Sequence, residues 1–130
     1  MRFDPEEVMS VTASCATHGN NSTVTLRAIK LLHTLVWALM AACVLALPVF
    51  AWIGEFRWAL MATSVIVVEC LVLAANRGRC PLTDWAARYT DDRRDNFDIY
   101  LPNWLARHNK TIFGTLFVVN AALAAWRWAA

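Results

Sequence analysis

An apolar segment from Leu31 to Ile53 constrains the fold of this chain more than any other feature. Its 23 residues include no acid, lysine or arginine. As an α-helix rising about 1.5 Å per residue, this segment spans a hydrocarbon core about 30 Å thick. Two further apolar runs follow, over residues 58–75 and 111–126. Because 58% of the residues are hydrophobic and only 17% are charged, the composition excludes a soluble domain and favours a membrane protein.

These runs predict an all-α fold, an integral membrane helical bundle with three transmembrane helices and amphipathic helices at the cytoplasmic interface. Only residues 54–57 separate the first two runs, which forces an antiparallel hairpin. The third run is short and gains length from its flanks. Residues 97–110 before it form either a separate interfacial helix or the start of the last span. The spans are expected at about 31–53, 58–75 and 109–128.

The chain divides into an N-terminal cytoplasmic arm, residues 1–22, and a membrane domain, residues 23–130. Asp4 followed by a proline and two glutamates is typical of a helix start, so a short helix is predicted over residues 5–17. This helix is expected to end near Gly19, where the polar turn GNNST precedes the first span.

A loop over residues 76–108 joins the second and third spans and is long for a simple connection. Gly78 and Pro81 are expected to end the second span, since glycine favours the helix C-terminus and proline cannot continue a helix. Thr83 is expected to cap a short amphipathic helix that runs through Tyr89 and lies at the lipid headgroups.

The basic residues predict the orientation of the chain. With three spans, the N-terminal arm and the long loop lie on one side of the membrane. That side holds ten of the twelve lysines and arginines, against only Arg57 and Arg127 on the other. The positive-inside rule therefore places the N-terminus in the cytoplasm and the C-terminus in the periplasm of a bacterial inner membrane. Tryptophans at the ends of the spans support the same frame, with four of them at the outer ends: Trp52, Trp58, Trp126 and Trp128.

Polar side chains within or beside the spans are the candidate site residues, because a membrane span seldom carries such groups without a role. Glu69 is the strongest candidate, and three explanations for it are open. It is a ligand or proton site, a hydrogen-bonding group that joins helices through Asn120 or Ser64, or a contact with another subunit. A polar pocket facing the cytoplasm is expected where the helix ends converge. The candidate ligand or proton-site residues are His33, Glu69, Asn76, His108 and Asn120.

Recognised catalytic motifs are absent, and we assign no catalytic residue. Nucleic-acid binding is excluded, because the basic residues alternate with acids and are explained by topology. The four cysteines are widely spaced, so neither a disulfide nor a cysteine-based metal site is expected. The segment around Cys80 is interpreted as a structural junction between the second span and the loop. The junction motif comprises Cys80, Pro81, Leu82, Thr83 and Asp84.

The order of these residues resembles a family of small bacterial inner-membrane proteins built around a CPLT motif after the second transmembrane helix. The residues that carry the resemblance are His33, Glu69, Cys80-Pro81-Leu82-Thr83, Asp84, Arg88 and Phe97 to Pro102. The chain departs from the family pattern where a histidine is replaced by Ile99 and where the glutamate after CPLT has only Asp84 or Asp91 to match it. The family has no assigned activity, so the resemblance implies fold and location.

Two functional hypotheses follow. The first is a non-enzymatic accessory or structural subunit of a larger membrane complex, which contacts a membrane-protein partner or forms a homo-oligomer and binds anionic lipids. The second is a small redox, metal-binding or haem-binding membrane protein that uses His33, Glu69 and His108. No cofactor is required by the first hypothesis.

Overall fold

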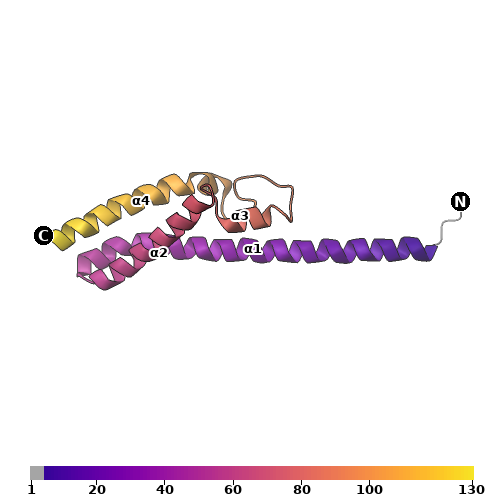
Figure 1. Ribbon diagram of the computed structural model, residues 1–130, viewed down its shortest axis with the longest axis horizontal. Coiled ribbons are helices and arrows are strands. Elements are labelled where there is room, and N and C mark those ends of the chain that lie inside the picture. The colour runs from indigo at the N-terminus through magenta and orange to yellow at the C-terminus, as the bar shows by residue number, and fades with distance from the viewer. Residues whose placement is uncertain (1–4) are drawn as a thin grey trace.

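The structure is a computed structural model that describes residues 5–130, without the side chains of residues 11, 12 and 14–18. It consists of four helices and no strand within that range: α1 (Pro5–Ile53), α2 (Phe56–Ala75), α3 (Pro81–Ala86) and α4 (Asn103–Ala129) (Figure 1). Three segments are long and apolar enough to cross a membrane, namely Gly19–Ile53, Phe56–Ala75 and Asn103–Ala129. The expected all-α bundle with three spans is therefore confirmed.

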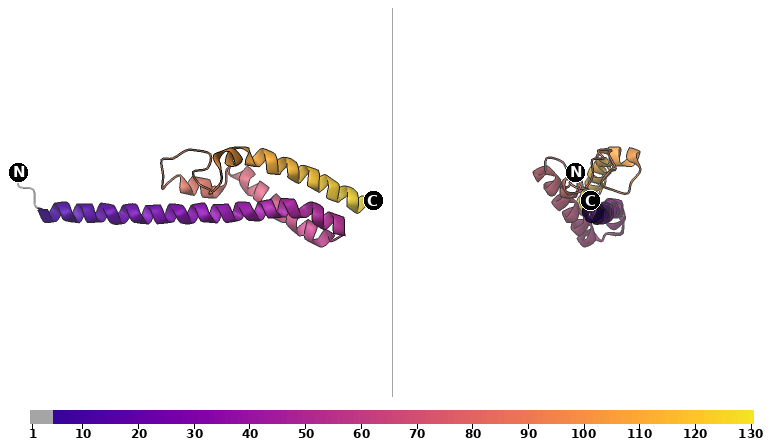
Figure 2. Two further views of the ribbon diagram at one scale, coloured as in Figure 1. Left: turned by 180° about the vertical axis from the view of Figure 1, so that it is seen from behind. Right: turned by 90° about the vertical axis from the view of Figure 1, so that its right-hand side faces the viewer.

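The long helix α1 forms the centre of the bundle. Both α2 and α4 pack along it, whereas α2 and α4 contact each other only slightly (Figure 2). The buried core lies between α1 and α2 and comprises Val44, Leu47, Ala59, Ala62 and Ile66. Phe113 and Phe117 of α4 pack against this core from the other side. The two alanines of α2 let its backbone approach α1 closely, which favours van der Waals packing between membrane helices.

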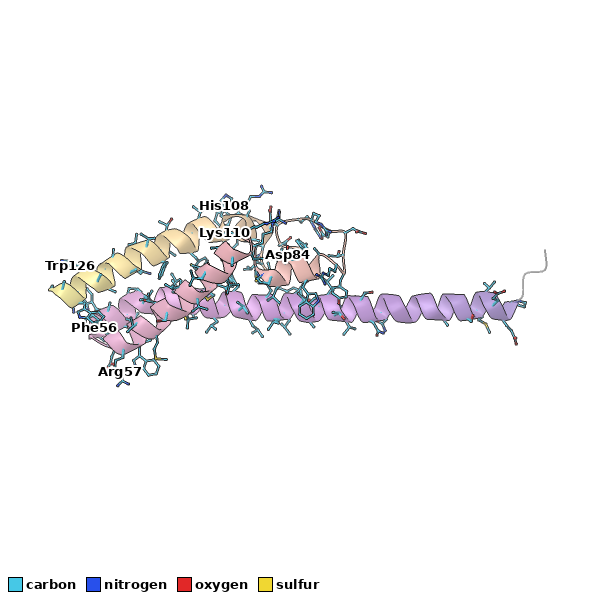
Figure 3. All side chains as sticks on the ribbon, viewed as in Figure 1. Phe56, Arg57, Asp84, His108, Lys110 and Trp126 are labelled. Atoms are coloured by element: carbon cyan, nitrogen blue, oxygen red, sulfur yellow. The ribbon has the colours of Figure 1, made fainter. Side chains whose placement is uncertain are left out.

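One end of the bundle, which we call the hairpin end, holds the turn between α1 and α2 and the C-terminus of α4. Gly54 makes this turn with φ of +80°, a conformation that costs glycine little. Aromatic side chains gather here: the Phe56 and Trp128 rings lie 5.5 Å apart, and the Arg127 guanidinium lies 5.4 Å from the Trp52 ring. Figure 3 shows Phe56 and Trp126 at this end. The expected grouping of tryptophans at one end is thus observed.

The opposite end, the loop end, holds residues 76–102. Helix α2 ends at Ala75. After Asn76, both Arg77 and Gly78 have a positive φ, of 57° and 77°. The Gly78 amide donates a 2.6 Å hydrogen bond to the Leu73 carbonyl, which closes the helix end. Helix α3 then begins with Pro81 at its first turn. The prediction that Gly78 and Pro81 end the second span is confirmed.

The predicted cap of the loop helix is wrong. Cys80 occupies the N-cap position of α3 without a capping hydrogen bond from its side chain. Thr83 lies within the helix, and its hydroxyl instead bonds to Asp98 in the loop. Helix α3 also ends at Ala86, before Tyr89, and the chain continues in tighter turns in which the Tyr89 amide donates a 3.0 Å hydrogen bond to the Ala86 carbonyl. The amphipathic helix is therefore shorter than expected.

The predicted turn in the N-terminal arm is also wrong, because α1 continues through residues 19–23 without a break. The hydroxyls of Thr23 and Thr25 donate 2.9 Å hydrogen bonds to the carbonyls of Gly19 and Asn21 on the preceding turn. Hydroxyl groups that favour a turn in isolation are thus accommodated inside the helix. The N-terminal part of α1 extends alone beyond the other helices (Figure 1). Among its described side chains, the first buried one is Ile29.

The structure decides how the last span begins. Helix α4 starts at Asn103, directly after Pro102, and continues without interruption to Ala129. Residues 103–110 therefore belong to the helix of the last span, while residues 96–102 do not form a separate α-helix. The α4 helix begins several residues before the expected start of the span at residue 109, because Pro102 is well suited to the position before a first helical turn.

Candidate functional site: a polar cavity at the loop end

A cavity of about 590 Å³ lies at the loop end, between α1, α2, α3, the start of α4 and the loop that joins α3 to α4. We call it the junction cavity. Its apolar side comes from the spans and includes Val36, Met40 and Leu73. The polar residues that line it are His33, Glu69, Arg79, Cys80, Thr83, Asp84, Arg93, Arg94, Asp95, Asp98, Arg107, Asn109 and Lys110. The spans thus meet a dense group of charged side chains at this point.

Asp98 forms the centre of the polar network. It is 4% exposed and is the one buried charged residue in the described part of the chain. His33 Nδ1 lies 3.0 Å from Asp98 Oδ2, and the Thr83 hydroxyl donates a 2.5 Å hydrogen bond to the same oxygen. The His33 Nδ1 does not meet the criteria for a hydrogen bond, so its contact with the Asp98 carboxylate is an ion pair. Asp98 therefore joins α1, α3 and the loop.

The charge state of Asp98 follows from two opposing effects. Burial is the largest and disfavours the carboxylate, which by itself raises the pKa. The contacts with His33 and Thr83 favour the carboxylate and together outweigh burial, so the pKa of Asp98 lies below its usual value. Asp98 is therefore ionised at neutral pH and attracts a proton to its partner imidazole.

The loop is fixed on α1 by contacts on either side of Asp98. Ile99 is 6% exposed and anchors the loop by burial. The Tyr100 amide donates a 3.0 Å hydrogen bond to the Thr34 hydroxyl, one residue beyond His33 on α1. The Lys30 ammonium lies 5.1 Å from the centre of the Tyr100 ring, at a cation–π distance. These contacts place the Asp98 carboxylate beside the imidazole.

The junction motif supplies the opposite wall of the cavity. The side chain of Cys80 lines the same cavity as His33, and its thiol is free and half-buried. The Asn76 amide donates hydrogen bonds of 2.8 Å to Asp84 Oδ2 and 3.0 Å to the Arg79 carbonyl. Asn76 thereby holds the turn between α2 and α3 and fixes the position of Cys80. Asn76 itself does not line the cavity and acts at its edge.

Glu69 is half-buried and lines the cavity from α2. Neither proposed helix-joining bond is formed, because the Asn120 amide donates to the Val44 carbonyl at 2.9 Å and the Ser64 hydroxyl donates to the Leu60 carbonyl at 2.8 Å. Within residues 5–130, Glu69 has no hydrogen-bond or ion-pair partner of its own. A carboxyl group in an apolar span that lacks a partner is a candidate ligand or proton site.

The cations of the cavity differ in how they are engaged. Arg107 Nε donates a 2.9 Å hydrogen bond to Asp95, and Lys110 donates to the Gly78 carbonyl. Arg93 donates to the carbonyls of Thr90 and Ala87. Arg79 contacts no acid or hydrogen-bond acceptor through its side chain among the described residues. It is the cation most available to a ligand.

Besides Asn76, two of the sequence candidates do not line the cavity. His108 is exposed, its ring lies 5.2 Å from that of Trp104, and its Nδ1 is 2.9 Å from the Trp104 carbonyl oxygen. Asn120 joins α4 to α1 within the membrane-spanning part. His33 and Glu69 therefore share the cavity, whereas His33 and His108 do not. No group of three or more histidine, cysteine or acidic residues that could hold a metal ion is found in the part of the chain that was searched, the described residues.

Comparisons with known proteins found no matching family model, no matching curated protein and no matching solved structure.

Asp98 and the free Arg79 are the functional candidates that sequence reasoning missed. In the sequence, Asp98 is one of five aspartates between residues 84 and 98, and charge alone does not separate it from the others. The available signal is its position between Phe97 and Ile99, which places an acid in a short apolar stretch. If the apolar neighbours draw this segment into the interior, the aspartate needs a partner there, because aspartate is almost never fully buried unpaired.

Proposed function

We propose that this protein is a small integral membrane protein that binds an amphiphile with an anionic headgroup in the junction cavity. One observation carries the proposal: the cavity joins an apolar wall from the spans to a set of cationic side chains. Val36 and Leu73 provide surface for an alkyl chain, and Arg79 and Lys110 provide charge for a headgroup. Binding sites of this size usually combine apolar surface with a few placed polar groups.

The charges that line the cavity favour an anion. Five lysines and arginines line it against four acids, and His33 adds a further basic group. The acids are mostly engaged: Asp84 by Asn76, Asp95 by Arg107, and Asp98 by His33 and Thr83. Of the lysines and arginines that line the cavity, Arg79 is the one whose side chain has no partner among the described residues, so a phosphate or carboxylate would complete its hydrogen bonding.

The proposed orientation supports the same ligand class. The side of the membrane that holds the arm and the loop end carries ten of the twelve lysines and arginines, which favours the cytoplasm for this side and the periplasm of a bacterial inner membrane for the C-terminus. Anionic lipids give the cytoplasmic leaflet a negative surface potential and attract basic segments. The resemblance to small inner-membrane proteins with a CPLT motif is consistent with this location.

The test is lipid retention by the purified protein. In nanodiscs that mix phosphatidylglycerol with phosphatidylcholine, phosphatidylglycerol is expected to be enriched around the wild type and retained in native mass spectra. Arg79→Gln should weaken this retention about fivefold, because one contact of a basic residue with an anionic surface is worth about 1 kcal/mol. Arg57→Gln, at the hairpin end (Figure 3), is the matched control and should leave retention unchanged. Equal losses in both variants, or no enrichment in the wild type, would refute the proposal.

A second candidate is the role of accessory subunit in a larger membrane complex, which a different observation favours. No residue of α4 is buried, and the part of α1 before Ile29 has no buried side chain among those described. Most helical stability in proteins comes from packing of one face against another element, so a partner would stabilise this part of α1. The same exposed surfaces of α4 and of the N-terminal part of α1 would provide the contacts of a homo-oligomer.

Chemical cross-linking in native membranes, followed by purification in a mild detergent, tests the subunit role. A defined complex that is lost on deletion of residues 5–18, with the spans still inserted, would support it. A monomer both before and after deletion would refute it. The redox or metal-binding alternative stays a prediction of the sequence, and an absorption spectrum and metal analysis of the same preparation test it directly.

A further inference from the structure

We propose that the ligand of the junction cavity is a monoacylated glycerol phosphate and that Glu69 accepts a hydrogen bond from its free hydroxyl. This inference rests on the proposed function and names the class of amphiphile within it. Glu69 and Arg79 both line the cavity of about 590 Å³, yet within residues 5–130 neither side chain is paired with the other or with any other residue. An acid and a cation that line one cavity without pairing are both available to a ligand that carries a donor and an anion.

Glu69 lies deeper in the membrane-spanning part than Arg79. Glu69 precedes Ala75, the last residue of α2, by six residues, which corresponds to about 9 Å along the helix axis. Arg79 follows the end of α2, where its amide donates a 3.1 Å hydrogen bond to the Asn76 carbonyl. A lipid in the cavity would therefore meet Glu69 close to its acyl chain and Arg79 at its headgroup.

The surroundings of Glu69 on the cavity wall are apolar. Leu73 lies one turn further along the same face of α2, and Met40 of α1 lines the cavity with them. The next residue, Cys70, is exposed, whereas Glu69 is half-buried. A carboxyl group is costly in an apolar span without a partner, and it accepts a hydrogen bond in both its ionised and its protonated form. A lipid hydroxyl at this depth would satisfy it.

Two cations come from the same corner of the cavity and suit a phosphate monoester. The Lys110 ammonium donates a hydrogen bond to the carbonyl of Gly78, the residue before Arg79. An ammonium has three donors, so two of them are left for a ligand, and the Arg79 guanidinium presents its own fork of donors. A phosphate monoester has three strong acceptor oxygens and a charge of about −1.5 to −2 at neutral pH, which matches two cations.

The order of the two groups with depth decides the class of lipid. In a diacyl phospholipid such as phosphatidylglycerol, the glycerol oxygens next to the chains are esters, and the headgroup hydroxyls lie beyond the phosphate. Such a lipid would engage Arg79 but offers no donor at the depth of Glu69. A monoacylated glycerol phosphate has its free hydroxyl between the acyl chain and the phosphate. It would therefore engage both groups and bind more tightly.

The experiment separates the hydroxyl from the phosphate by the choice of lipid. Full-length protein in a mild detergent is titrated with oleoyl glycerol phosphate, with its analogue that lacks the free hydroxyl, and with monooleoylglycerol, which lacks the phosphate. Native mass spectra give the bound fraction of each lipid. The hydroxyl is expected to strengthen binding about tenfold, the effect of one hydrogen bond. Arg79→Gln should weaken binding of both phosphates alike and leave their ratio unchanged.

Variants of Glu69 test whether this carboxyl group is the acceptor. Glu69→Leu should remove the preference for the hydroxyl, whereas Glu69→Gln keeps a carbonyl acceptor and should retain part of the preference. Glu55→Leu is the matched control, because it removes an acid at the hairpin end whose side chain makes no capping hydrogen bond. This control should keep the full preference. A preference that survives in Glu69→Leu would overturn the assignment of the acceptor.

The three lipids distinguish failure of this inference from failure of the proposed function. If both phosphates bind the wild type equally and more tightly than monooleoylglycerol, the inference is wrong and the proposed function stands. If monooleoylglycerol binds as tightly as oleoyl glycerol phosphate, the anion contributes nothing, and the proposed function is refuted together with the phosphate.

Discussion

His33 on α1 and Asp98 in the α3–α4 loop lie on segments far apart in the chain, yet the imidazole Nδ1 and the carboxylate Oδ2 are only 3.0 Å apart. This contact fixes the loop to the central helix α1. It lies at the centre of the polar network that lines the junction cavity. Asp98 is 4% exposed, so the network excludes most water from this carboxylate. Buried charges of this kind are tolerated only when they are paired and hydrogen-bonded.

Removing the negative charge of Asp98 should destabilise the loop. Asp98→Asn weakens the contact with His33 and the charged hydrogen bond from Thr83, and we expect a loss of about 2 kcal/mol in unfolding free energy. Reversible denaturation in detergent, followed by tryptophan fluorescence, provides the measurement. Asp92→Asn is the matched control, because Asp92 pairs with Arg94 on the surface and its loss should change stability little. An equal effect of the two substitutions would contradict the central role of Asp98.

The stability of the fold should decrease in acid through the same carboxylate. The pKa of Asp98 in the folded protein lies below the usual value of 3.8, so the unfolded chain takes up a proton at a higher pH than the folded one. The stabilising contribution is therefore complete well above pH 3.8 and is lost as the pH falls through the lower folded value. Thermal unfolding in detergent from pH 6 to pH 3 tests this. Asp98→Asn should flatten the profile, and an unchanged profile would argue against it.

Glu69 should be dispensable for folding. Its carboxyl group lacks a partner in residues 5–130, so Glu69→Leu removes a polar group from an apolar span and should stabilise the protein by about 1–2 kcal/mol. Glu69→Gln should leave stability near the wild-type value. Both variants are measured by denaturation and by lipid retention in native mass spectra. Strong destabilisation by the leucine would reveal a structural partner for the carboxyl group.

Gly78 should be required for the turn that ends α2. Its φ of 77° is unfavourable for residues with a Cβ atom, so Gly78→Ala is expected to cost about 1–2 kcal/mol, although the added methyl group meets open space. Gly114→Ala, in the middle of α4 with equally open surroundings, is the control and should stabilise the helix by up to about 1 kcal/mol. Denaturation of both variants distinguishes backbone conformation from crowding. A stabilising Gly78→Ala would contradict the left-handed turn.

Trp37 and Asn109 should act as a coupled pair that holds α4 on α1. The Trp37 indole Nε1 donates a 2.7 Å hydrogen bond to Asn109 Oδ1, and the Trp37 ring meets Phe113 edge-on with centroids 5.5 Å apart. A double-mutant cycle of Trp37→Phe and Asn109→Ala should give a coupling free energy of about 1 kcal/mol, the size found for hydrogen bonds between membrane helices. Additive effects within error would show that the bond adds nothing to the packing of the helices.

The sequence was sufficient for features that depend on local composition. The lengths of the apolar runs predicted three spans, the short link at Gly54 predicted the hairpin, and Gly78 with Pro81 predicted the end of α2. Each of these follows from the requirement that backbone polar groups in lipid be satisfied within a helix, and from the φ angles that glycine and proline allow. His33 and Glu69 were also found in this way, because polar groups stand out in apolar runs.

Only the tertiary structure decided the continuity of α1 and the composition of the site. Residues 19–23 favour a turn by their types, yet hydroxyl groups such as that of Thr23 bond within the helix once the flanking turns are helical. Only its apolar neighbours distinguish Asp98 from the other loop aspartates in the sequence, and its partners His33 and Thr83 became known only once the loop folded back on α1. Contacts between distant segments depend on the path of the whole chain, and burial beside a specific partner gives an ordinary residue its chemistry.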